Sequence, residues 1–291
     1  MQVDIPADIP AINRRLFLSL VGASALPSFA RTLKVIGVQL YTVRFVLPQK
    51  PLETLRAIEQ IGYREVEATA NNLDAIWPSL KQTSLKPVSL HLDPGIFLHA
   101  QDKIPAAIDS AKQHGFQYVV CPYVAPKDRG GVEVVRKLAD SLNSAGELAH
   151  KAGMNLCYHN HAFDFQPIGN GKTLLDVLLE TANPKYVGLE LDIMWAQVAG
   201  VDPVSVLQKY GHRVELMHLK DVAPGTAQRY NEGIPRNAFR EVGNGVIKIQ
   251  PVLKAAAQAG VKHYFVEQDQ TPGDPIDSLR QSFQYLEKVN Y

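Results

Sequence analysis

The sequence predicts an α/β fold, a single (β/α)8 barrel, on three observations. Short apolar, β-rich runs alternate with amphipathic helical stretches along most of the chain. Several helical stretches end at a glycine directly before the next β-rich run, as in IGYREVE and HGFQYVV, and glycine commonly follows the last turn of a helix. About eight such units in roughly 260 residues match the size and rhythm of this barrel.

Eight segments have the composition of buried strands: residues 34–41, 64–69, 87–92, 118–124, 155–161, 186–193, 214–220 and 263–269. Between them apolar residues recur at helical spacing, as in Leu52, Leu55 and Ile58. A doubly wound open sheet is the alternative. It would normally carry a glycine-rich phosphate-binding turn after the first strand, and GVQLYTVR has none.

The N-terminal region differs from the rest of the chain. Arg14 and Arg15 precede an apolar run over residues 16–26, and a small-x-small pattern ends at Ala30. This pattern is typical of an export signal and resembles the twin-arginine type. The run is shorter than the roughly 20 residues of a membrane span. An amphipathic N-terminal helix and an uncleaved anchor are the alternatives.

The expected organisation is therefore a signal peptide at residues 1–30 and a barrel at residues 31–291. After cleavage we expect a protein without a stable membrane span. We expect it to be periplasmic or otherwise exported. Cys121 and Cys157 are the only cysteines, and both lie in strand-like stretches. We expect two buried free thiols, with a single disulfide as the alternative.

Charge and loop length indicate the kind of ligand. The formal net charge is +1, which gives no electrostatic reason to expect a nucleic acid as partner. The longest irregular stretch, residues 221–245, follows the seventh strand, and such loops are usually lids or binding loops. Arg229, Tyr230 and Arg236 could close over a ligand there, although surface solvation explains them equally well.

Polar residues are concentrated at the ends of six predicted strands, in pairs spaced two apart. The pairs are Glu65 and Glu67, His91 and Asp93, His159 and His161, Glu190 and Asp192, His218 and Lys220, and Glu267 and Asp269. Members of a pair point to the same face of their strand. Buried carboxylates and imidazoles without partners are costly, so we expect the set to converge on one ion or polar ligand. Histidines bonded to the backbone and structural ion pairs are the alternative.

Mixed histidine and carboxylate ligands suit one divalent metal ion, Mn²⁺, Zn²⁺, Fe²⁺ or Co²⁺. The segments CYHNHAFDF, VGLELDIMW, VELMHLKD, EVGNGVIKIQPVL and FVEQDQ resemble the xylose isomerase-like TIM barrel superfamily, which includes sugar isomerases and epimerases and is related to endonuclease IV. The resemblance extends from about Leu33 to Val289. It implies a metal held by Asp192, His218 and Glu267, with His159 at the strand-five position where the family usually has glutamate.

The histidine on strand five departs from the two-carboxylate pattern of the family's ketose epimerases. We expect His159 to bind the metal, and a general base is its alternative role. The resemblance and the site composition make His161, Lys220 and Glu267 the expected acid and base groups.

Four further residues are expected to bind the substrate. Glu67, His91 and Glu190 are placed to bond sugar hydroxyls. Trp195 could form a platform for a sugar ring, and packing against the next helix is its alternative role.

The run His159-Asn160-His161 spells HNH, which is also the name of a nuclease motif. The nuclease motif of that name requires a ββα-metal context with histidines far apart in sequence, so three adjacent letters do not support it. His91 resembles a zinc histidine of endonuclease IV, but the glutamate that bridges its metals is missing on strand five. The sequence therefore favours one metal ion and excludes a three-metal site.

The resulting hypothesis is a metal-dependent isomerase or epimerase that removes an α-proton from a non-phosphorylated sugar and stabilises an enediolate. A 3-keto-glycoside lyase or hydrolase using the same enolate is the first alternative. A noncatalytic sugar-binding protein of the cell envelope is the second, and it would retain no metal after dialysis. The expected partner is a small carbohydrate, and the sequence leaves open whether the chain forms a homo-oligomer.

Overall fold

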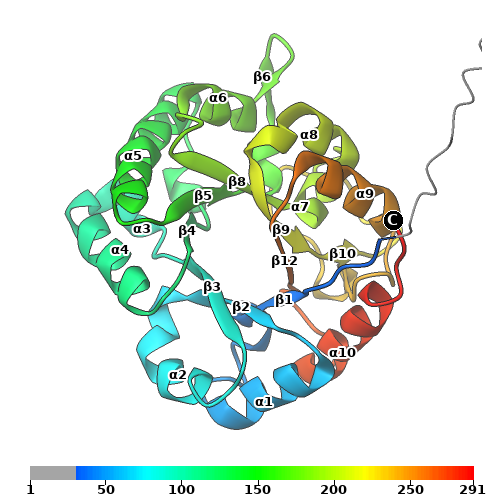
Figure 1. Cartoon of the computed structure of the whole chain (residues 1–291). Coiled ribbons are helices and arrows are strands. Elements are labelled where there is room, and N and C mark those ends of the chain that lie inside the picture. Colours follow the sequence, from blue (N-terminus) through cyan, green and yellow to red (C-terminus); the bar gives the residue numbers. More distant parts are fainter. Residues whose placement is uncertain (1–30) are drawn as a thin grey trace, which may run out of the picture. The chain divides into compact units, whose positions relative to one another are not determined.

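The structure, a computed structural model, describes residues 31–291, so the predicted signal peptide and its cleavage after Ala30 lie outside the described residues. Eight parallel strands close into a barrel in the order β1-β12-β9-β8-β5-β4-β3-β2, surrounded by helices (Figure 1). The barrel strands are β1 (Gly37–Gln39), β2 (Glu65–Thr69), β3 (Lys86–His91), β4 (Tyr118–Cys121), β5 (Asn155–His159), β8 (Val187–Asp192), β9 (Val214–Leu219) and β12 (His263–Val266). The predicted single (β/α)8 barrel is confirmed.

Ten α-helices cover the described part of the chain. They are α1 (Pro51–Ile61), α2 (Leu73–Leu80), α3 (Gly95–His99), α4 (Ile104–Gln113), α5 (Val132–Lys151), α6 (Leu174–Thr181), α7 (Ile193–Val198), α8 (Pro203–Tyr210), α9 (Ile249–Ala259) and α10 (Pro275–Leu286). Their apolar faces pack on the outer face of the barrel and form the main hydrophobic core. The strands are therefore buried on both faces, as in other parallel sheets. Among residues 31–291, no helix combines the length and apolar character that crossing a membrane requires.

All eight predicted strands are present, but four end two or three residues earlier than expected. The first ends at Gln39, because the 3-10 helix η1 (Leu40–Val43) begins directly after it. The fifth ends at His159 and not at residue 161. The fourth ends at Cys121 and not at residue 124, and the eighth ends at Val266 and not at residue 269. The chain thus leaves these strands at the functional end of the barrel and places side chains above them.

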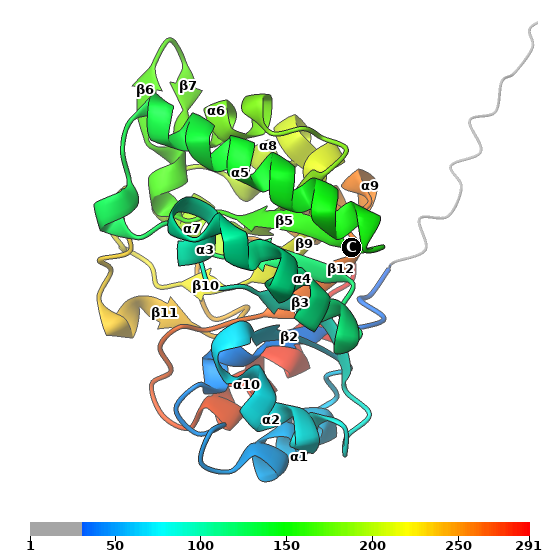
Figure 2. The ribbon, with the colours of Figure 1, turned by 90° about the vertical axis from the view of Figure 1, so that its left-hand side faces the viewer.

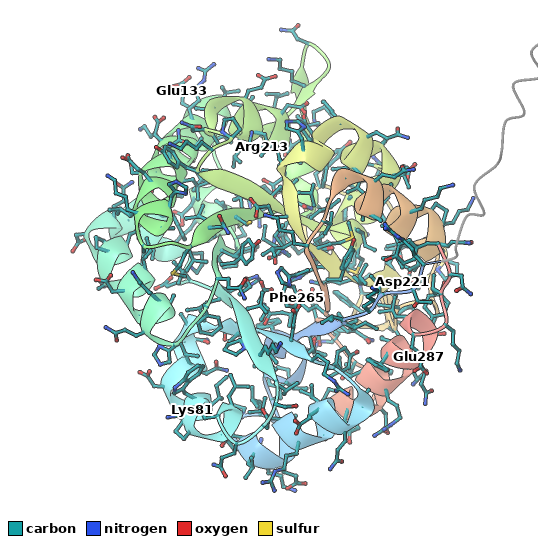
Figure 3. The ribbon with its side chains drawn as sticks, viewed as in Figure 1. Lys81, Glu133, Arg213, Asp221, Phe265 and Glu287 are labelled. Atoms are coloured by element: carbon teal, nitrogen blue, oxygen red, sulfur yellow. The ribbon has the colours of Figure 1, made fainter. Side chains whose placement is uncertain are left out.

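The barrel interior is apolar below the polar strand ends. Phe265, Cys157 and Leu216 lie two residues before Glu267, His159 and His218 respectively, and they therefore share the inner face one layer lower. Phe265 lies near the middle of the ring of strands (Figure 3). Its ring lies against Gly37, where a side chain would overlap it. This layer closes the bottom of the polar site.

The two cysteines occupy opposite faces of adjacent strands. Cys157 belongs to the interior cluster, whereas Cys121 packs in the outer core among the helices. Both are buried free thiols, as the sequence predicted.

The long connection after β9 contains a small sheet of its own. Strands β10 (Asp221–Val222) and β11 (Phe239–Arg240) pair antiparallel at one end of the barrel, away from the C-terminus (Figure 2). The Asp221 carboxylate accepts hydrogen bonds from four backbone N–H groups, those of Val222, Gly243, Gly245 and Ile247, at 2.9–3.1 Å. A side chain at Gly245 would overlap this carboxylate. These bonds fix the far end of the connection over the barrel.

A second small sheet follows β5. The strands β6 (Pro167–Gly169) and β7 (Lys172–Thr173) form a hairpin that projects from the barrel. It contributes no residue to the site described below.

Candidate active site

The ends of six strands bring a set of polar side chains together inside the mouth of the barrel. Each is at most 8% exposed: Glu67, His91, His159, Glu190, Asp192, His218, Lys220 and Glu267. Parallel strands of a barrel end at the same face, where the active sites of such barrels lie. The predicted convergence of these residues is therefore observed.

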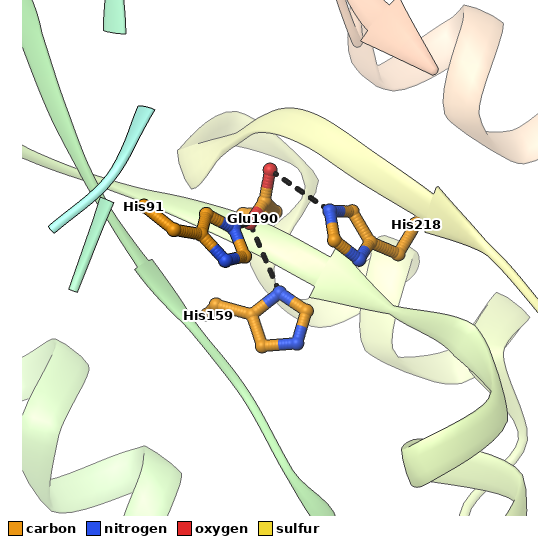
Figure 4. Close-up of side chains that lie close together, drawn as sticks. All are labelled: His91, His159, Glu190 and His218. Carbon is orange, nitrogen blue, oxygen red and sulfur yellow. Dashed lines mark hydrogen bonds and ion pairs between the residues drawn. The ribbon is translucent and has the colours of Figure 1, made fainter. Parts of the chain in front are cut away.

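Four of these residues form a first cluster around Glu190. One ligand atom from each of His91, His159, Glu190 and His218 lies within 4.8 Å of the others (Figure 4). Glu190 Oε2 lies 2.9 Å from His91 Nε2 and 3.0 Å from His159 Nδ1. Glu190 Oε1 lies 3.4 Å from His218 Nε2. The carboxylate thus holds three imidazoles in a fixed arrangement.

A second cluster shares His218 with the first. Ligand atoms of Asp192, His218 and Glu267 lie within 4.8 Å of one another. His218 Nδ1 is 2.8 Å from Glu267 Oε2, and His159 Nε2 is 3.7 Å from Asp192 Oδ2. The four ligands predicted from the sequence therefore lie close together, but they are distributed over two neighbouring clusters.

Lys220 lies among the acids of the second cluster. Its Nζ is 3.1 Å from Asp192 Oδ2, 2.5 Å from Glu267 Oε2 and 2.8 Å from Asp269 Oδ1. Burial alone would lower the pKa of Lys220, but these carboxylates outweigh it and hold the pKa well above its usual value. Lys220 is therefore a charged ammonium at the edge of the site.

Two predicted substrate-binding residues lie below the cavity. Glu67 and Glu190 have no exposed surface, and neither lines the cavity described next. Glu67 Oε1 lies 2.6 Å from His218 Nε2 and 2.9 Å from His91 Nε2, and it accepts a hydrogen bond from Gln39. Because the histidines cover them, both glutamates orient imidazoles in this structure and do not reach a ligand's hydroxyls.

A cavity of about 830 Å³ opens above the clusters. Its lining includes His91, His159, His161, Trp195, Lys220, Glu267 and Asp269, together with Tyr41, Glu232 and Arg236 from the surrounding loops. This volume lies in the upper part of the range of about 300–1,000 Å³ for small-molecule sites. Of the predicted substrate-binding residues, His91 and Trp195 therefore reach the cavity.

The histidines have different charge states. Burial would lower the pKa of His91, but Glu67 and Glu190 outweigh it and raise the pKa to about 9. The pKa of His218 is also raised well above its usual value, because the same acids outweigh burial. Burial lowers the pKa of both His159 and His161, which makes them neutral. Neutral imidazoles can accept a proton or bind a metal.

His161 and Trp195 form one wall of the cavity. Their rings stack with centroids 5.6 Å apart and planes at 26°. His161 Nδ1 and Trp195 Nε1 are buried and have no hydrogen-bond partner in the described structure. Buried polar atoms normally have a partner, so these two are exceptions within the wall.

The donor atoms of the two clusters fit a divalent cation. Three buried carboxylate oxygens accept no hydrogen bond from the described residues: Glu67 Oε2, Glu190 Oε1 and Asp192 Oδ2. Asp192 Oδ2 lies 3.1 Å from the Lys220 ammonium and 3.7 Å from His159 Nε2. Carboxylate oxygens beside neutral imidazole nitrogen form the ligand set that Mn²⁺, Zn²⁺, Fe²⁺ and Co²⁺ accept. The cluster could therefore hold a metal ion, of an identity the ligands do not specify.

A latch joins the long connection to the opposite side of the cavity. Arg129, after β4, lies 3.0 Å from Glu232 in the β10–β11 connection, and its guanidinium covers the Phe163 ring at 3.8 Å. Of the loop residues predicted to close over a ligand, Arg236 lines the cavity. Arg229 instead donates to the carbonyl of Gly233 within its own loop.

One member of the predicted pairs does not join the site. Glu65 pairs with His263 at 2.8 Å, at the other end of their strands. The expectation that all six pairs converge is therefore wrong for Glu65, because residues spaced two apart on a strand lie in different layers of the barrel. Asp93 lies outside both clusters but lines the cavity, where it is exposed and accepts a hydrogen bond from the Gly95 N–H.

Sequence reasoning also missed two residues that complete the site. Gln39 bonds Glu67, and Asn160 pairs with the backbone of Asp192. Asp269, which the sequence placed in the converging set without a role of its own, bonds Lys220. For Gln39 no sequence signal distinguished it from an ordinary strand residue.

Known proteins resemble this chain in sequence. Inosose dehydratase of Geobacillus thermodenitrificans is 33% identical over 165 residues, covering 52% of this chain and 53% of that protein. Inosose dehydratase of Clostridium botulinum is 28% identical over 206 residues, 66% of this chain and 67% of that protein. The chain thus matches between about half and two thirds of the length of these relatives.

Solved structures share the fold over most of the chain. A sugar phosphate isomerase/epimerase from Parabacteroides distasonis superposes with a TM-score of 0.72 at 23% identity, covering 92% of this chain and 98% of that one. The IolI protein with a bound zinc atom superposes with a TM-score of 0.66 at 16% identity, covering 88% and 99%. The 3-keto-D-glucoside 4-epimerase from E. coli superposes with a TM-score of 0.62 at 16% identity, covering 86% and 98%.

The family match covers nearly all of the barrel. Residues 55–289 match the family described as xylose isomerase-like TIM barrel. This range contains seven of the eight barrel strands and every charged residue of both clusters. The chain therefore belongs to the xylose isomerase-like TIM barrel family.

Proposed function

We propose that the protein is a metal-dependent lyase acting on a non-phosphorylated carbohydrate that carries a ketone. It removes the proton on the carbon beside the carbonyl and expels the substituent on the next carbon. The single observation that carries this proposal is the meeting of Asp192, His218 and Glu267 around one point, directly beside a cavity that also contains neutral and cationic proton-transfer groups.

The elimination balances without an oxidant or reductant. A base takes the α-proton, and the C–H electron pair forms an enolate. The enolate re-forms the carbonyl while the bond to the β-substituent breaks. The products are an unsaturated ketone and the departing group, which takes up a proton.

Three residues of the cavity wall are assigned roles in this sequence. His161 is the proposed base, because its ring lines the cavity and burial keeps the imidazole neutral. The Lys220 ammonium is the proposed donor to the oxygen that departs. Glu267 holds this ammonium at 2.5 Å and also binds His218. The pKa of Glu267 is well below its usual value because Lys220 and His218 outweigh burial, so this carboxylate stays ionised and paired with the ammonium.

A divalent cation would be held by Asp192, His218 and Glu267, with His159 beside them. When bound, it would polarise the ketone and stabilise the negative charge of the enolate. The IolI structure, which has the same fold, contains a bound zinc atom, and this supports a divalent cation in a barrel of this kind. Mn²⁺, Zn²⁺, Fe²⁺ and Co²⁺ all suit these ligands.

Several observations support a substrate without phosphate. The cavity is lined by four carboxylates, Asp93, Glu232, Glu267 and Asp269, against three cationic side chains, Lys220, Arg236 and His91. Lys220 is already paired with acids. We also propose that the protein acts after export, which rests on the paired arginines and the apolar run of residues 14–26. Sugar phosphates are cytoplasmic metabolites, so an exported enzyme would meet neutral sugars.

Elimination is placed before isomerisation because the sequence relatives are inosose dehydratases, and dehydration is an elimination. This reverses the order of the two hypotheses that the sequence raised. Isomerisation or epimerisation remains the second candidate, supported by the names of two structures that share the fold. It would start from the same enolate and return the proton to carbon.

Product analysis in deuterated water separates these functions. The protein, loaded with Mn²⁺, is incubated with a 3-keto-glucoside, an inosose and a free ketose. Elimination predicts release of the β-substituent. Deuterium in recovered sugar without cleavage would favour the isomerase. Neither reaction with any of the three classes would favour a noncatalytic binding protein and overturn the proposal. Asp192→Asn is the inactive control.

A further inference from the structure

The cavity mouth carries an exposed aromatic surface that the proposed chemistry does not use. Tyr41 in η1 is 43% exposed and lines the cavity, and Phe45 just after η1 is 69% exposed. The guanidinium carbon of Arg44 lies 4.1 Å from the centre of the Tyr41 ring and 4.3 Å from that of Phe45. Single exposed aromatics are ordinary, but two rings held on one guanidinium, one of them lining a cavity, form an aromatic platform.

The platform is fixed in place by hydrogen bonds. Arg44 donates to the Tyr41 carbonyl at 2.9 Å and to the Asp269 carbonyl at 2.6 Å. The Tyr41 N–H donates to Gln39 Oε1 at 3.0 Å, and Gln39 in turn donates to Glu67. A preorganised aromatic surface costs little entropy when a ligand binds. These hydrogen bonds therefore hold the platform in one arrangement before a ligand binds.

The platform lies next to the group that would protonate the departing oxygen. Asp269 joins the two: its carbonyl accepts from Arg44, and its carboxylate lies 2.8 Å from Lys220 Nζ. A substituent that leaves beside Lys220 would extend toward Tyr41. The cavity of about 830 Å³ also exceeds the needs of one sugar ring, because its size is typical of drug-sized ligands.

We propose that the platform of Tyr41, Arg44 and Phe45 binds an aromatic aglycone, so that the substrate is an aryl glycoside whose sugar ring lies at the metal end of the cavity. Aromatic ligands gain from stacking on aromatic rings and on guanidinium planes. This inference rests on the proposed function for the position of the sugar. It goes beyond that function by naming the departing group.

Binding can be measured without turnover, using glycosides that carry no ketone. Calorimetric titration compares phenyl and methyl β-D-glucopyranoside on the Mn²⁺-loaded protein. We expect the wild type to bind the phenyl glycoside about tenfold more tightly. The Tyr41→Ala/Phe45→Ala double variant should reduce this ratio to near one. Leu148→Ala is the matched control: it removes an exposed apolar side chain late in α5, at the opposite end of the barrel, and should leave the ratio unchanged.

Three outcomes would overturn the platform. The first is equal affinity for the two probes, or binding of neither. The second is a preference for cellobiose over the phenyl glycoside, since that would indicate a sugar subsite. The third is a wild-type dimer that Phe45→Ala dissociates in sedimentation velocity without altering the ratio. A tenfold ratio without any elimination would keep the platform and remove the proposed function, whereas elimination with equal affinities would do the reverse.

Discussion

Asn160 and Asp192 exchange two hydrogen bonds between neighbouring strands of the barrel. The Asn160 side-chain amide donates to the Asp192 carbonyl at 3.2 Å, and the Asp192 N–H donates to Asn160 Oδ1 at 3.0 Å. Both residues are completely buried. The middle residue of the His159-Asn160-His161 run thus has a structural role: it fixes β5 to β8 at the level where the two strands present their site residues.

Replacement of this amide should weaken both fold and site. Asn160→Ala leaves the Asp192 N–H and carbonyl buried without partners, at a cost of about 2–4 kcal/mol in the free energy of unfolding. We expect Mn²⁺ affinity to fall as well, because Asp192 loses its position. Chemical denaturation and metal titration measure the two effects. Asn143→Ala, which removes an amide on the outside of the barrel that also bonds backbone groups, is the control. Unchanged metal affinity in Asn160→Ala would contradict the positioning role.

Glu67 should act on the metal through the histidines it orients. Glu67→Gln keeps an acceptor but removes the charge that holds His218 and His91, at 2.6 Å and 2.9 Å. Loss of such an outer carboxylate typically lowers metal affinity about 10–100-fold. Competition with a chromogenic chelator measures this. Glu65→Gln, on the same strand but paired with His263 in the lower layer, should leave the affinity unchanged. Equal effects of the two variants would refute the assignment.

The Arg129–Glu232 latch should affect substrate binding more than turnover. Its half-buried ion pair, 3.0 Å long, holds the β10–β11 connection over the cavity. Arg129→Ala should raise KM about three- to tenfold, as loss of about 1 kcal/mol predicts, with a smaller change in kcat. Arg136→Ala breaks an exposed pair with Glu133 on α5 and serves as the matched control. A fall in kcat at constant KM would instead place Arg129 in the chemical step.

Asp164 should make stability depend on pH. Burial raises the pKa of its carboxyl from 3.8 to about 7, against the hydrogen bonds from the His161 N–H and Tyr158. The folded state therefore favours the protonated form. The cost of ionising Asp164 is absent below about pH 4, grows as pH rises to about 7 and is constant above that. The stability of the wild type relative to Asp164→Asn should fall over this window, as urea denaturation at several pH values would measure. A difference that rises between pH 4 and 7 would show that the hydrogen bonds dominate.

The sequence predicted the barrel well because its signals were local. Each buried strand is a short apolar run, and several preceding helices end at a glycine, so eight strands could be placed within a few residues. The errors lie at the functional ends. The segment 34–41 reads as one strand, yet it turns into η1 after Gln39. No local pattern marks that turn, because Leu40 and Val43 are as apolar as strand residues and are buried in η1.

The sequence predicted most of the residues that form the site but not which of them contact one another. Spacing by two placed the chemistry-bearing residues at strand ends, which required only the strand period. Which carboxylate meets which imidazole depends on closure of the barrel: Glu67 on β2 reaches His218 on β9, at 151 positions' separation. For the same reason Glu67 and Glu190 were expected in the cavity, whereas they lie beneath the histidines. The four expected ligands fall into two clusters because of how the strands are aligned around the closed barrel, and no sequence pattern shows that alignment.

Metal content tests the central claim most directly. Protein comprising residues 31–291 is loaded with Mn²⁺, dialysed and analysed by inductively coupled plasma mass spectrometry, beside Asp192→Ala, His218→Ala and the control His263→Gln. We predict about one ion per chain in the wild type and the control, and none in the other two variants, which should also lose exchange of the substrate α-proton with solvent. An active wild-type protein without metal, or full α-proton exchange in Asp192→Ala and His218→Ala, would contradict the account.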